Sequence, residues 1–554
     1  MAGNEIQRVP VAIVGGGPVG LMLALFLDRH GVQSVVFNSE PTVRVHPKGS
    51  THNSRTMEHY RRLGFAAQVR KLGLPPDHPT DSVYMTRLSG YELARLPMPS
   101  ETEKMRMVAN APRTGQIPEP IHRANQMYVE ALLLERARSR ANITLRYGWR
   151  VDEFSQDNDC VSLRAVSEDG GTQNFNALYL AGCDGGKSFV RRALGISYEG
   201  HAGLEQEFFG QHMISTYFRA PSLYRDHLGT RRAWQYWVVN PELRTAIVAL
   251  DGKDEFILWS RLADPEQPID DAAVARLAQR ATGADIPVEI VAHGPWTGGI
   301  ALHAERFGEG RVWLAGDAVH LFTPTGGFGM NTGIDDAANL AWKLAAMVQG
   351  WGGPKLVASY EQERKPIAVR NTAASRALAK NIGDVKVPPE LEDATPEGEK
   401  ARREVGAFLA TFGEEFASLG VQLGARYDGS SIIAVDGAPP ADSFTSYIPS
   451  SVPGGRAPHF WIGDGRGQGD SLFDRLGEGF TLLRLGSKPP STASFEQAAR
   501  ERNVPLKVID IADAQARELY ERDLVLIRPD QHVAWRGNAA PADANALFAK
   551  LTGD

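Results

Sequence analysis

Cysteine is nearly absent from this chain: its 554 residues include only Cys160 and Cys183. Two cysteines exclude a disulfide framework and a metal site built from several thiolates, so no metal site is expected. An excess of positive charge is also absent, because 60 Lys and Arg residues stand against 66 Asp and Glu residues, for a formal net charge of -6. We therefore expect binding neither to nucleic acid nor to an anionic membrane.

Long apolar runs are missing as well. The longest near the start is Leu21–Leu27, far below the roughly 20 residues that a membrane span needs. The first residues do not combine a charged stretch, an apolar stretch and a cleavage site, so secretion is not expected. Together with the low cysteine content, this predicts a cytoplasmic protein in a reducing environment.

The composition that is present fits a folded protein with a large core, since 42% of the residues are hydrophobic and 23% are charged. The length alone predicts two to four domains. Near the start, the sequence predicts a buried strand at Val9–Val14, a helix at Pro18–Arg29 and a second strand at Ser34–Phe37. This order and spacing are typical of a parallel βαβ unit.

A glycine motif, GxGxxG, joins that first strand to the helix. Gly15 permits a tight turn, Gly17 lets the backbone approach a pyrophosphate, and Gly20 lets the helix pack closely on the strand. The helix that opens at Pro18 directs unpaired N–H groups and a partial positive charge at the phosphates. In this βαβ setting the motif predicts dinucleotide binding; a purely structural glycine turn is the alternative.

Asn38 stands where such folds usually place an acidic residue that binds the ribose. An amide can still form a hydrogen bond to a ribose hydroxyl, but without charge assistance. Glu40, two residues later, is a second candidate for that contact. The alternative in which neither residue touches the ligand remains open.

Further along the chain, several stretches have the pattern of helices or strands. Helices are predicted over 123–141, 272–282 and 335–349, and strands over 144–180 and, with many aromatic residues, over 205–300. The polar, proline-bearing stretch 386–400 predicts a linker or exposed loop. After about residue 430, strands alternate with helices again, which indicates a small separate α/β domain.

Two further motifs change the interpretation from a dinucleotide in general to a flavin. Asp184-Gly185 lies in LYLAGCDGG, and Gly316-Asp317 lies in GRVWLAGDAVHLFTPTGGFGMN. With these motifs and the first glycine turn, residues 8–375 resemble the class A flavoprotein monooxygenases, the single-component aromatic hydroxylases. The resemblance is specific because three separate motifs occur in that family's order and spacing.

The resemblance implies which residues bind FAD. Asp317 would bind the ribityl chain, and Asp184 would lie near the pyrophosphate and the nicotinamide cofactor. The loop 324–331 would place backbone N–H groups under the isoalloxazine, and the helix expected from near Asp335 would direct its positive end at reduced flavin. Lys48 stands where relatives commonly have arginine, and it offers a point charge in place of a planar fork. The expected cofactor-binding residues are Gly15, Gly17, Pro18, Gly20, Asn38, Lys48, Gln126, Asp184, Asp317, Pro324, Gly327, Gly329, Met330 and Asn331.

The fold class expected is α/β. The resemblance implies a Rossmann-like FAD-binding domain of the p-hydroxybenzoate hydroxylase type at 1–200 and 295–380, with an inserted antiparallel sheet for the substrate at 201–294. A helical linker at 381–430 would lead to a thioredoxin-like α/β domain at 431–554, similar to that of the phenol hydroxylase branch. This last segment contains no cysteine, which excludes redox activity through a CxxC pair, so a scaffold or interface role is expected.

The resemblance also implies the reaction. NADPH or NADH would reduce FAD, O2 would add at the flavin C4a, and the hydroperoxide formed would hydroxylate a small aromatic substrate. A phenol or aryl carboxylate is the first interpretation, and a larger polyketide-like phenol is the second. Ring attack needs a base near the phenol hydroxyl, and the candidates are His52, Tyr236 and His212, each of which is equally well explained as a packed side chain.

Other functions remain open from sequence alone. A non-catalytic protein of the same fold would need no flavin, although the intact GDAVH and GFGMN stretches argue against it. A Baeyer–Villiger or epoxidising monooxygenase would share the cofactor and differ in its product. The Trp-x-Trp-x-Ile-Pro motif of the flavin halogenases does not occur. A homodimer is also an open alternative.

Overall fold

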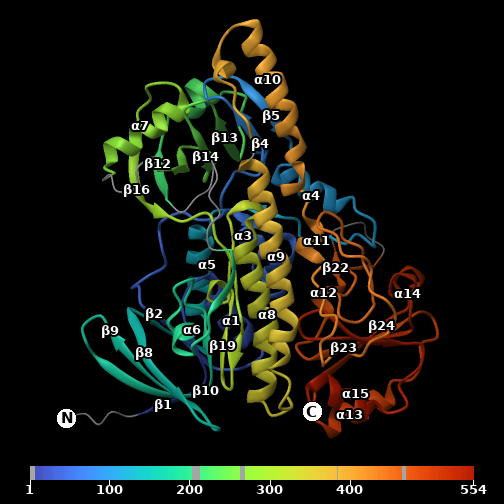
Figure 1. Ribbon diagram of the computed structural model, residues 1–554. Helices are drawn as coiled ribbons and strands as arrows, with labels where there is room; N and C mark the ends of the chain where they lie inside the picture. Colours follow the sequence, from blue (N-terminus) through green and yellow to red (C-terminus); the bar gives the residue numbers. More distant parts are fainter. Residues whose placement is uncertain (1–5, 202–211, 263–268, 384, 464–468) are drawn as a thin grey trace.

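The strand before the first glycine turn lies inside a mixed sheet in the computed structural model, which describes residues 6–201, 212–262, 269–383, 385–463 and 469–554 (Figure 1). The path of this sheet is β18 (Gly308–Glu309), β19 (Val312–Leu314), β10 (Thr172–Gly182), β1 (Gln7–Val14), β2 (Ser34–Asn38) and β7 (Ile143–Tyr147). β1 is parallel to β2 and β10, and β10 is parallel to β19. Since parallel strands share one carboxyl edge, the turns that carry Gly15, Asp184 and Asp317 come together there.

Helix α1 (Pro18–Arg29) has the bounds that the sequence predicts. Helix α5 (Gln126–Arg138) is shorter than the expected 123–141, because Arg123 belongs to the short strand β6 (His122–Arg123), which pairs with β3 (Thr51–His52). The strands expected over 144–180 are β7, β8 (Trp149–Gln156), β9 (Val161–Ser167) and β10. α1 packs against both α5 and α8.

Helix α8 (Phe328–Val348) begins well before Asp335, so the predicted start of this helix is wrong. The glycine-rich stretch GFGMNTG resembles a loop in sequence, but its glycines serve close packing. A Cβ on Gly333 would lie 2.6 Å from Val19 Cγ2 and 3.0 Å from Gly316 Cα. The positive end of α8 consequently lies at Gly327, next to the loop, and not at Asp335.

A second sheet has the order β16-β12-β15-β14-β13-β4-β5. Its strands are β12 (Met213–Arg219), β13 (Gln235–Val239), β14 (Arg244–Ala249), β15 (Glu255–Arg261), β16 (Glu289–Trp296), β4 (Ser82–Met85) and β5 (Glu92–Leu96). The expected range 201–294 is too narrow, because β4 and β5 come from outside it and β4 is parallel to β13. Their pairing joins segments far apart in sequence, which local periodicity does not reveal. The helix expected at 272–282 is α7 (Asp271–Thr282).

The stretch 386–400, expected as a linker or exposed loop, contains a 3₁₀ turn at Pro389–Glu392 and the start of α10 (Pro396–Leu409). Thr395 caps this helix by accepting a hydrogen bond from the Gly398 N–H. Val405 and Leu409 of α10 are buried in a hydrophobic cluster that Leu93 and Leu96 of β5 also contact. The segment thus covers one edge of the second sheet.

The C-terminal segment forms a unit with a four-stranded sheet of its own, in the order β24 (Leu506–Ile511), β23 (Phe480–Leu485), β25 (Leu524–Ile527) and β26 (Val533–Gly537). It packs beside α8 and α9 (Ser359–Gly383), which run next to each other (Figure 1). Trp342 and Ala346 of α8 share a hydrophobic cluster with Phe480 and Phe548 of this unit. In the described part of the chain, no helix is long and apolar enough to cross a membrane.

Buried charges also join this unit to the rest of the molecule. Arg528 donates hydrogen bonds to both carboxylate oxygens of Glu363 on α9, at 2.5 and 2.8 Å, and both side chains are shielded from water. Arg456 forms two hydrogen bonds to Glu58 on α2 (Ser54–Arg62). In each pair both residues are needed, because removing one would leave the other charge buried without a partner, which lowers the stability of the fold.

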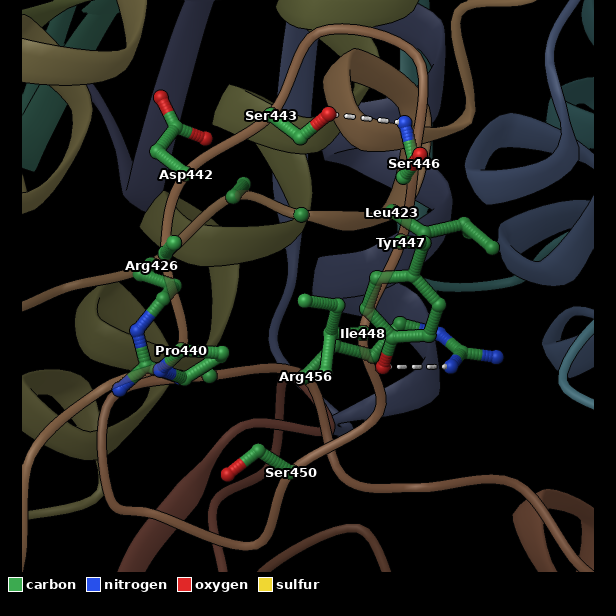
Figure 2. A pocket seen from close by; sticks show the side chains of 14 residues that line it. Leu423, Arg426, Pro440, Asp442, Ser443, Ser446, Tyr447, Ile448, Ser450 and Arg456 are labelled. Atoms are coloured by element: carbon green, nitrogen blue, oxygen red, sulfur yellow. Dashed lines mark hydrogen bonds between the residues drawn. The ribbon is translucent and has the colours of Figure 1, made fainter.

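A small cavity lies near Arg456, where 423–426 meet 440–456 (Figure 2). The Arg456 guanidinium donates a hydrogen bond of 3.2 Å to the Tyr447 hydroxyl there (Figure 2). The volume of about 30 Å³ has room for about two water molecules. This cavity is therefore too small for an aromatic substrate.

Candidate active site

The first glycine turn opens into a large cavity. Gly15 has φ of +113°, and a Cβ there would lie 2.2 Å from the Cys183 carbonyl oxygen. A Cβ on Gly20 would lie 1.9 Å from the Gly15 carbonyl oxygen, so these two positions need glycine for packing. A Cβ on Gly17 would meet nothing within 4 Å. The backbone at Gly17 therefore faces open space at the amino end of α1, where an anion is favoured.

Asn38, at the end of β2, spans the glycine turn. Its Oδ1 accepts a hydrogen bond from the Gly16 N–H at 3.1 Å, and its Nδ2 donates to the Glu40 carbonyl oxygen at 3.0 Å. A carboxylate has no donor for the second bond. The geometry thus explains an amide at this position without a ribose contact, although Asn38 does line the cavity.

The large cavity has a volume of about 380 Å³ and brings together three motifs that are distant in sequence. Basic side chains gather around it from several loops, namely Arg44, Lys48, Arg150 and Lys187. Among the expected cofactor-binding residues it is lined by Gly15, Gly17, Pro18, Asn38, Lys48, Gln126, Asp184, Asp317 and Met330. Gly20, Gly329 and Asn331 do not line it; Pro324 and Gly327 line a second cavity.

The two motif aspartates differ in what they hold. Asp184 accepts hydrogen bonds from the Ser188 hydroxyl and from the Val190 N–H at 3.1 Å, so it shapes its own loop. Burial raises the pKa of Asp184 despite these bonds. The Asp317 carboxylate is exposed to the cavity and has no hydrogen-bond partner among the described residues. Asp317 is consequently free to accept hydrogen bonds from ligand hydroxyls.

These features fit an adenine dinucleotide with a flavin. The space above Gly17 and the amino end of α1 suit a pyrophosphate, and Arg44, Lys48 and Lys187 supply positive charge near it. The free carboxylate of Asp317 suits a chain of hydroxyl groups. The cavity that results passes from the first glycine turn to Met330, at the start of α8.

The Asn331 side chain forms hydrogen bonds that join Gly327 to the segment 51–53, which precedes α2. Its Nδ2 donates to the Thr51 carbonyl oxygen at 2.9 Å and to that of Gly327 at 2.6 Å, while its Oδ1 accepts from the Asn53 N–H at 2.9 Å. Asn331 is 3% exposed. Its side chain holds the loop in place and is not free to meet a ligand. Gln126 is also engaged, because its Nε2 donates to Glu130.

A second cavity, of about 70 Å³, is lined in part by residues 324–328. Its walls combine the loops 49–53 and 324–328 with the second sheet and the segment 415–422. The aromatic residues that line it are Trp234, Trp259, Phe328 and Phe416, and the polar ones include Arg123, Gln235 and Glu415. A flat, apolar ligand with a polar substituent fits such a lining.

The three bases suggested by the sequence do not line this cavity. His52 is fully buried, with Nδ1 3.1 Å from the Tyr60 hydroxyl and Nε2 3.0 Å from the Ala124 carbonyl oxygen, and burial lowers its pKa to about 3. Tyr236 is fully buried, its hydroxyl accepts from the Ala233 N–H at 2.7 Å, and burial raises its pKa. His212 is exposed just before β12. The structure therefore favours the packed alternative for His52 and Tyr236 and gives His212 no contact with the site.

Arg123 and Glu415 are the site residues that the sequence hypothesis missed. Arg123 is brought next to Thr51 by the pairing of β6 with β3. Glu415 is the last residue of a 3₁₀ segment, Ala410–Glu415, that follows α10. No motif marks either position. The sequence offered one indication for Arg123, namely its place three residues before the expected cofactor-binding residue Gln126, in the stretch RANQ.

Comparison with known proteins matches two family models, "FAD binding domain" over residues 8–375 and "Aromatic-ring hydroxylase, C-terminal" over 450–553. The FAD-dependent monooxygenase apdD of Emericella nidulans is 31% identical, with 100% of this chain and 92% of that protein covered. A putative polyketide hydroxylase of Streptomyces halstedii is 31% identical over 97% and 94%. The solved structure of chromopyrrolic acid-soaked RebC with bound 7-carboxy-K252c has a TM-score of 0.88 at 35% identity, over 99% of this chain and 100% of that one.

Proposed function

Because this chain belongs to the family of FAD-binding aromatic-ring hydroxylases, we propose that it inserts one oxygen atom of O2 into a phenolic aromatic substrate, using FAD and NADPH or NADH. The observation that carries the proposal is the pair of cavities that the stretch 324–331 helps to line, one at Met330 and the other at 324–328. One has the lining of a dinucleotide site, and the other has the lining of a site for a flat aromatic ring.

FAD, once reduced by the nicotinamide cofactor, supplies the activation of O2. We assign its phosphates to the open backbone at Gly17 and the amino end of α1, and its hydroxyls to Asp317. The chain's own contribution is to orient the ring and to exclude water. Trp234, Trp259 and Phe416 provide the apolar walls for this.

The substrate class follows from the second cavity and from the relatives. Its volume of about 70 Å³ favours a single-ring phenol as the first compound to test. Relatives named as phenol 2-monooxygenase and as polyketide hydroxylases support a phenolic ring and make a larger polyketide-like phenol the second.

The test is a screen of phenols for stimulated oxidation of NADPH and of NADH by the yellow, FAD-containing protein. A product heavier by one oxygen atom that keeps its aromatic absorption supports hydroxylation. The same mass gain with loss of that absorption assigns a Baeyer–Villiger or epoxidising reaction instead. A colourless protein whose melting temperature and fluorescence do not respond to added FAD contradicts the proposal.

We further propose that the protein works in the cytoplasm. Both cysteines are free thiols, which suits the reducing cytoplasm where NADPH and NADH are available. A homodimer is the assembly to test, by light scattering of the FAD-loaded protein.

A further inference from the structure

Two polar groups that line the second cavity have no hydrogen-bond partner in the described part of the chain. The Trp234 Nε1–H and the Gln235 Oε1 are buried and have no hydrogen-bond partner. Both residues line the cavity together with Arg123 and Glu415. Buried polar groups in folded proteins are nearly always paired, with protein, water or ligand, so this group of unpaired atoms indicates a polar ligand.

Arg123 brings a cation to the cavity, and its opposite charge there is Glu415, which forms no ion pair with it in the described part of the chain. Its side chain is buried, at 7% exposure, and its guanidinium stacks on the Trp234 ring with Cζ 3.8 Å from the ring centroid. It donates to the Thr51 hydroxyl and to the Met98 sulfur, and in the described ranges no carboxylate lies within ion-pair distance, although the charge of Glu415 acts on it at longer range. Burial lowers the pKa of Arg123 to about 9. A buried cation of this kind is stabilised by an anionic oxygen on the ligand.

Glu415 brings a carboxyl group to the same cavity. Its Oε1 accepts a hydrogen bond from the Gly326 N–H at 3.1 Å, which ties it to the glycine-rich loop. Its Oε2 has no partner among the residues described. Burial raises the pKa of Glu415, which makes this carboxylate a better acceptor for a proton than an exposed one.

The chemistry of the ligand follows from this combination. A hydrocarbon ring would leave the Trp234 Nε1–H and the Gln235 Oε1 unpaired and would offer no polar group to Arg123 or Glu415. An aryl carboxylate would bring a second negative charge beside Glu415. A phenol instead offers a proton to the carboxylate and an oxygen to the guanidinium, on a flat ring that suits Trp234 and Phe416.

We propose that Glu415 is the base that takes the hydroxyl proton of a phenolic substrate and that Arg123 binds the resulting phenolate. The phenol O–H bond breaks, the proton passes to Oε2 of Glu415, and the electron pair stays on the phenolate oxygen, which accepts a hydrogen bond from Arg123. The ring becomes more electron-rich, as hydroxylation requires. This inference rests on the proposed function and names the catalytic base within it.

Glu415→Gln tests the base, because glutamine keeps an oxygen for the Gly326 N–H and loses the proton acceptor. We expect unchanged FAD content and melting temperature and a fall in kcat of about 100-fold with phenol. With a nitrophenol that is already ionised at the assay pH, we expect a fall of less than about threefold, since no proton remains to be taken. Glu289→Gln, on the 66% exposed side chain at the start of β16, is the matched control and should leave both rates unchanged.

The result that overturns the assignment is an equal loss of kcat for phenol and for the ionised nitrophenol, or no loss for either. Loss of FAD from the variant would assign Glu415 to the structure of the loop and would also overturn it. If the wild-type protein oxygenates no phenol at all, the proposed function fails instead, so the two failures are distinguishable.

Arg123→Lys and Arg123→Gln test the phenolate site by equilibrium binding, read as quenching of tryptophan fluorescence. With the ionised nitrophenol we expect Kd to rise about tenfold or more for Gln and less for Lys, because Lys keeps the charge without the planar fork. With the corresponding methyl ether, which carries no charge, Kd should not change by more than about twofold. Equal weakening for both ligands would mean that Arg123 supports only the shape of the cavity, and that overturns its role.

Discussion

Asp317 differs from the other expected cofactor-binding residues because its carboxylate faces the large cavity and makes no hydrogen bond within the described protein. Asp317→Ala is expected to weaken FAD binding about 10- to 100-fold, since a hydrogen bond to a charged group contributes about 1.5–3 kcal/mol. Titration of the apoprotein with FAD, followed by flavin fluorescence, measures this. Asp226→Ala, at an exposed surface pair, is the control. An unchanged Kd for Asp317→Ala contradicts the assignment.

A substitution at Asn38 distinguishes a contact with the ribose of FAD from a role in holding the glycine turn. If residue 38 contacts the ribose, Asn38→Asp keeps or tightens FAD binding through charge. The hydrogen bonds to Gly16 and Glu40 predict the opposite, because a carboxylate accepts from the Gly16 N–H but repels the Glu40 carbonyl oxygen. We expect Asn38→Asp to bind FAD about fivefold more weakly in the same titration. Tighter binding would instead support a contact between residue 38 and the ribose.

Residues in glycine and aspartate motifs were predictable from sequence because each motif fixes a backbone shape at a strand end. Gly15, Gly17 and Asp317 line one cavity for that reason. The base was not predictable in this way. Arg123 and Glu415 meet only through the fold, and no spacing rule connects a short strand with a 3₁₀ turn so far along the chain.

At the scale of the element, α8 carries the loop and is shaped by small residues. Gly333→Ala would place its Cβ 2.6 Å from Val19 and 3.0 Å from Gly316, so α1 or the Asp317 turn must move. We expect a loss of about 1–3 kcal/mol in the free energy of unfolding and weaker FAD binding. Urea denaturation and FAD titration measure the two effects. Gly294→Ala, where a Cβ would meet nothing within 4 Å, should change neither, and equal behaviour of both variants contradicts this explanation.

The lesson for elements is that periodicity located α1 and α7 well and misplaced the start of α8. A glycine in a helix is usually unfavourable, so GFGMNTG indicated a loop. Close approach of α8 to α1 outweighs that preference. The membership of β4 and β5 in the second sheet was likewise beyond local patterns, because it depends on pairing with β13.

At the scale of the whole molecule, Arg528 links the C-terminal unit to α9. Arg528→Met would leave Glu363 and Asp530 without their main partner in a site closed to water. We expect a loss of about 3–5 kcal/mol in the free energy of unfolding, with flavin release and tryptophan exposure at the same urea concentration. Arg403→Met, at an exposed pair on α10, should cost less than about 1 kcal/mol. Two separate transitions in the wild type would contradict this coupling.

Buried histidines predict how the stability of the whole molecule depends on pH. Burial lowers the pKa of His52 from 6.5 to about 3 and that of His59 to about 4. Between the unfolded pKa of 6.5 and these lowered pKa values, the two histidines bind protons in the unfolded chain but not in the folded one. The free energy of unfolding therefore falls as pH drops from 6.5 towards 4. Below 4.5 the loss steepens, because the pKa of Glu363 is lowered to about 2 by Arg528 and Lys343 and the folded chain resists its protonation. Urea midpoints at pH 7.5, 6 and 5 measure this, and a midpoint that stays constant or rises would contradict it.

The central claim is that one molecule of FAD, held between the glycine turn and α8, directs oxygen onto a phenolic ring in the second cavity. The most direct measurement is the mass of the product formed from a phenol, NADPH or NADH, and oxygen-18 gas. The account predicts one labelled oxygen atom in a product that is still aromatic. Turnover of the phenol without label in its product would contradict it.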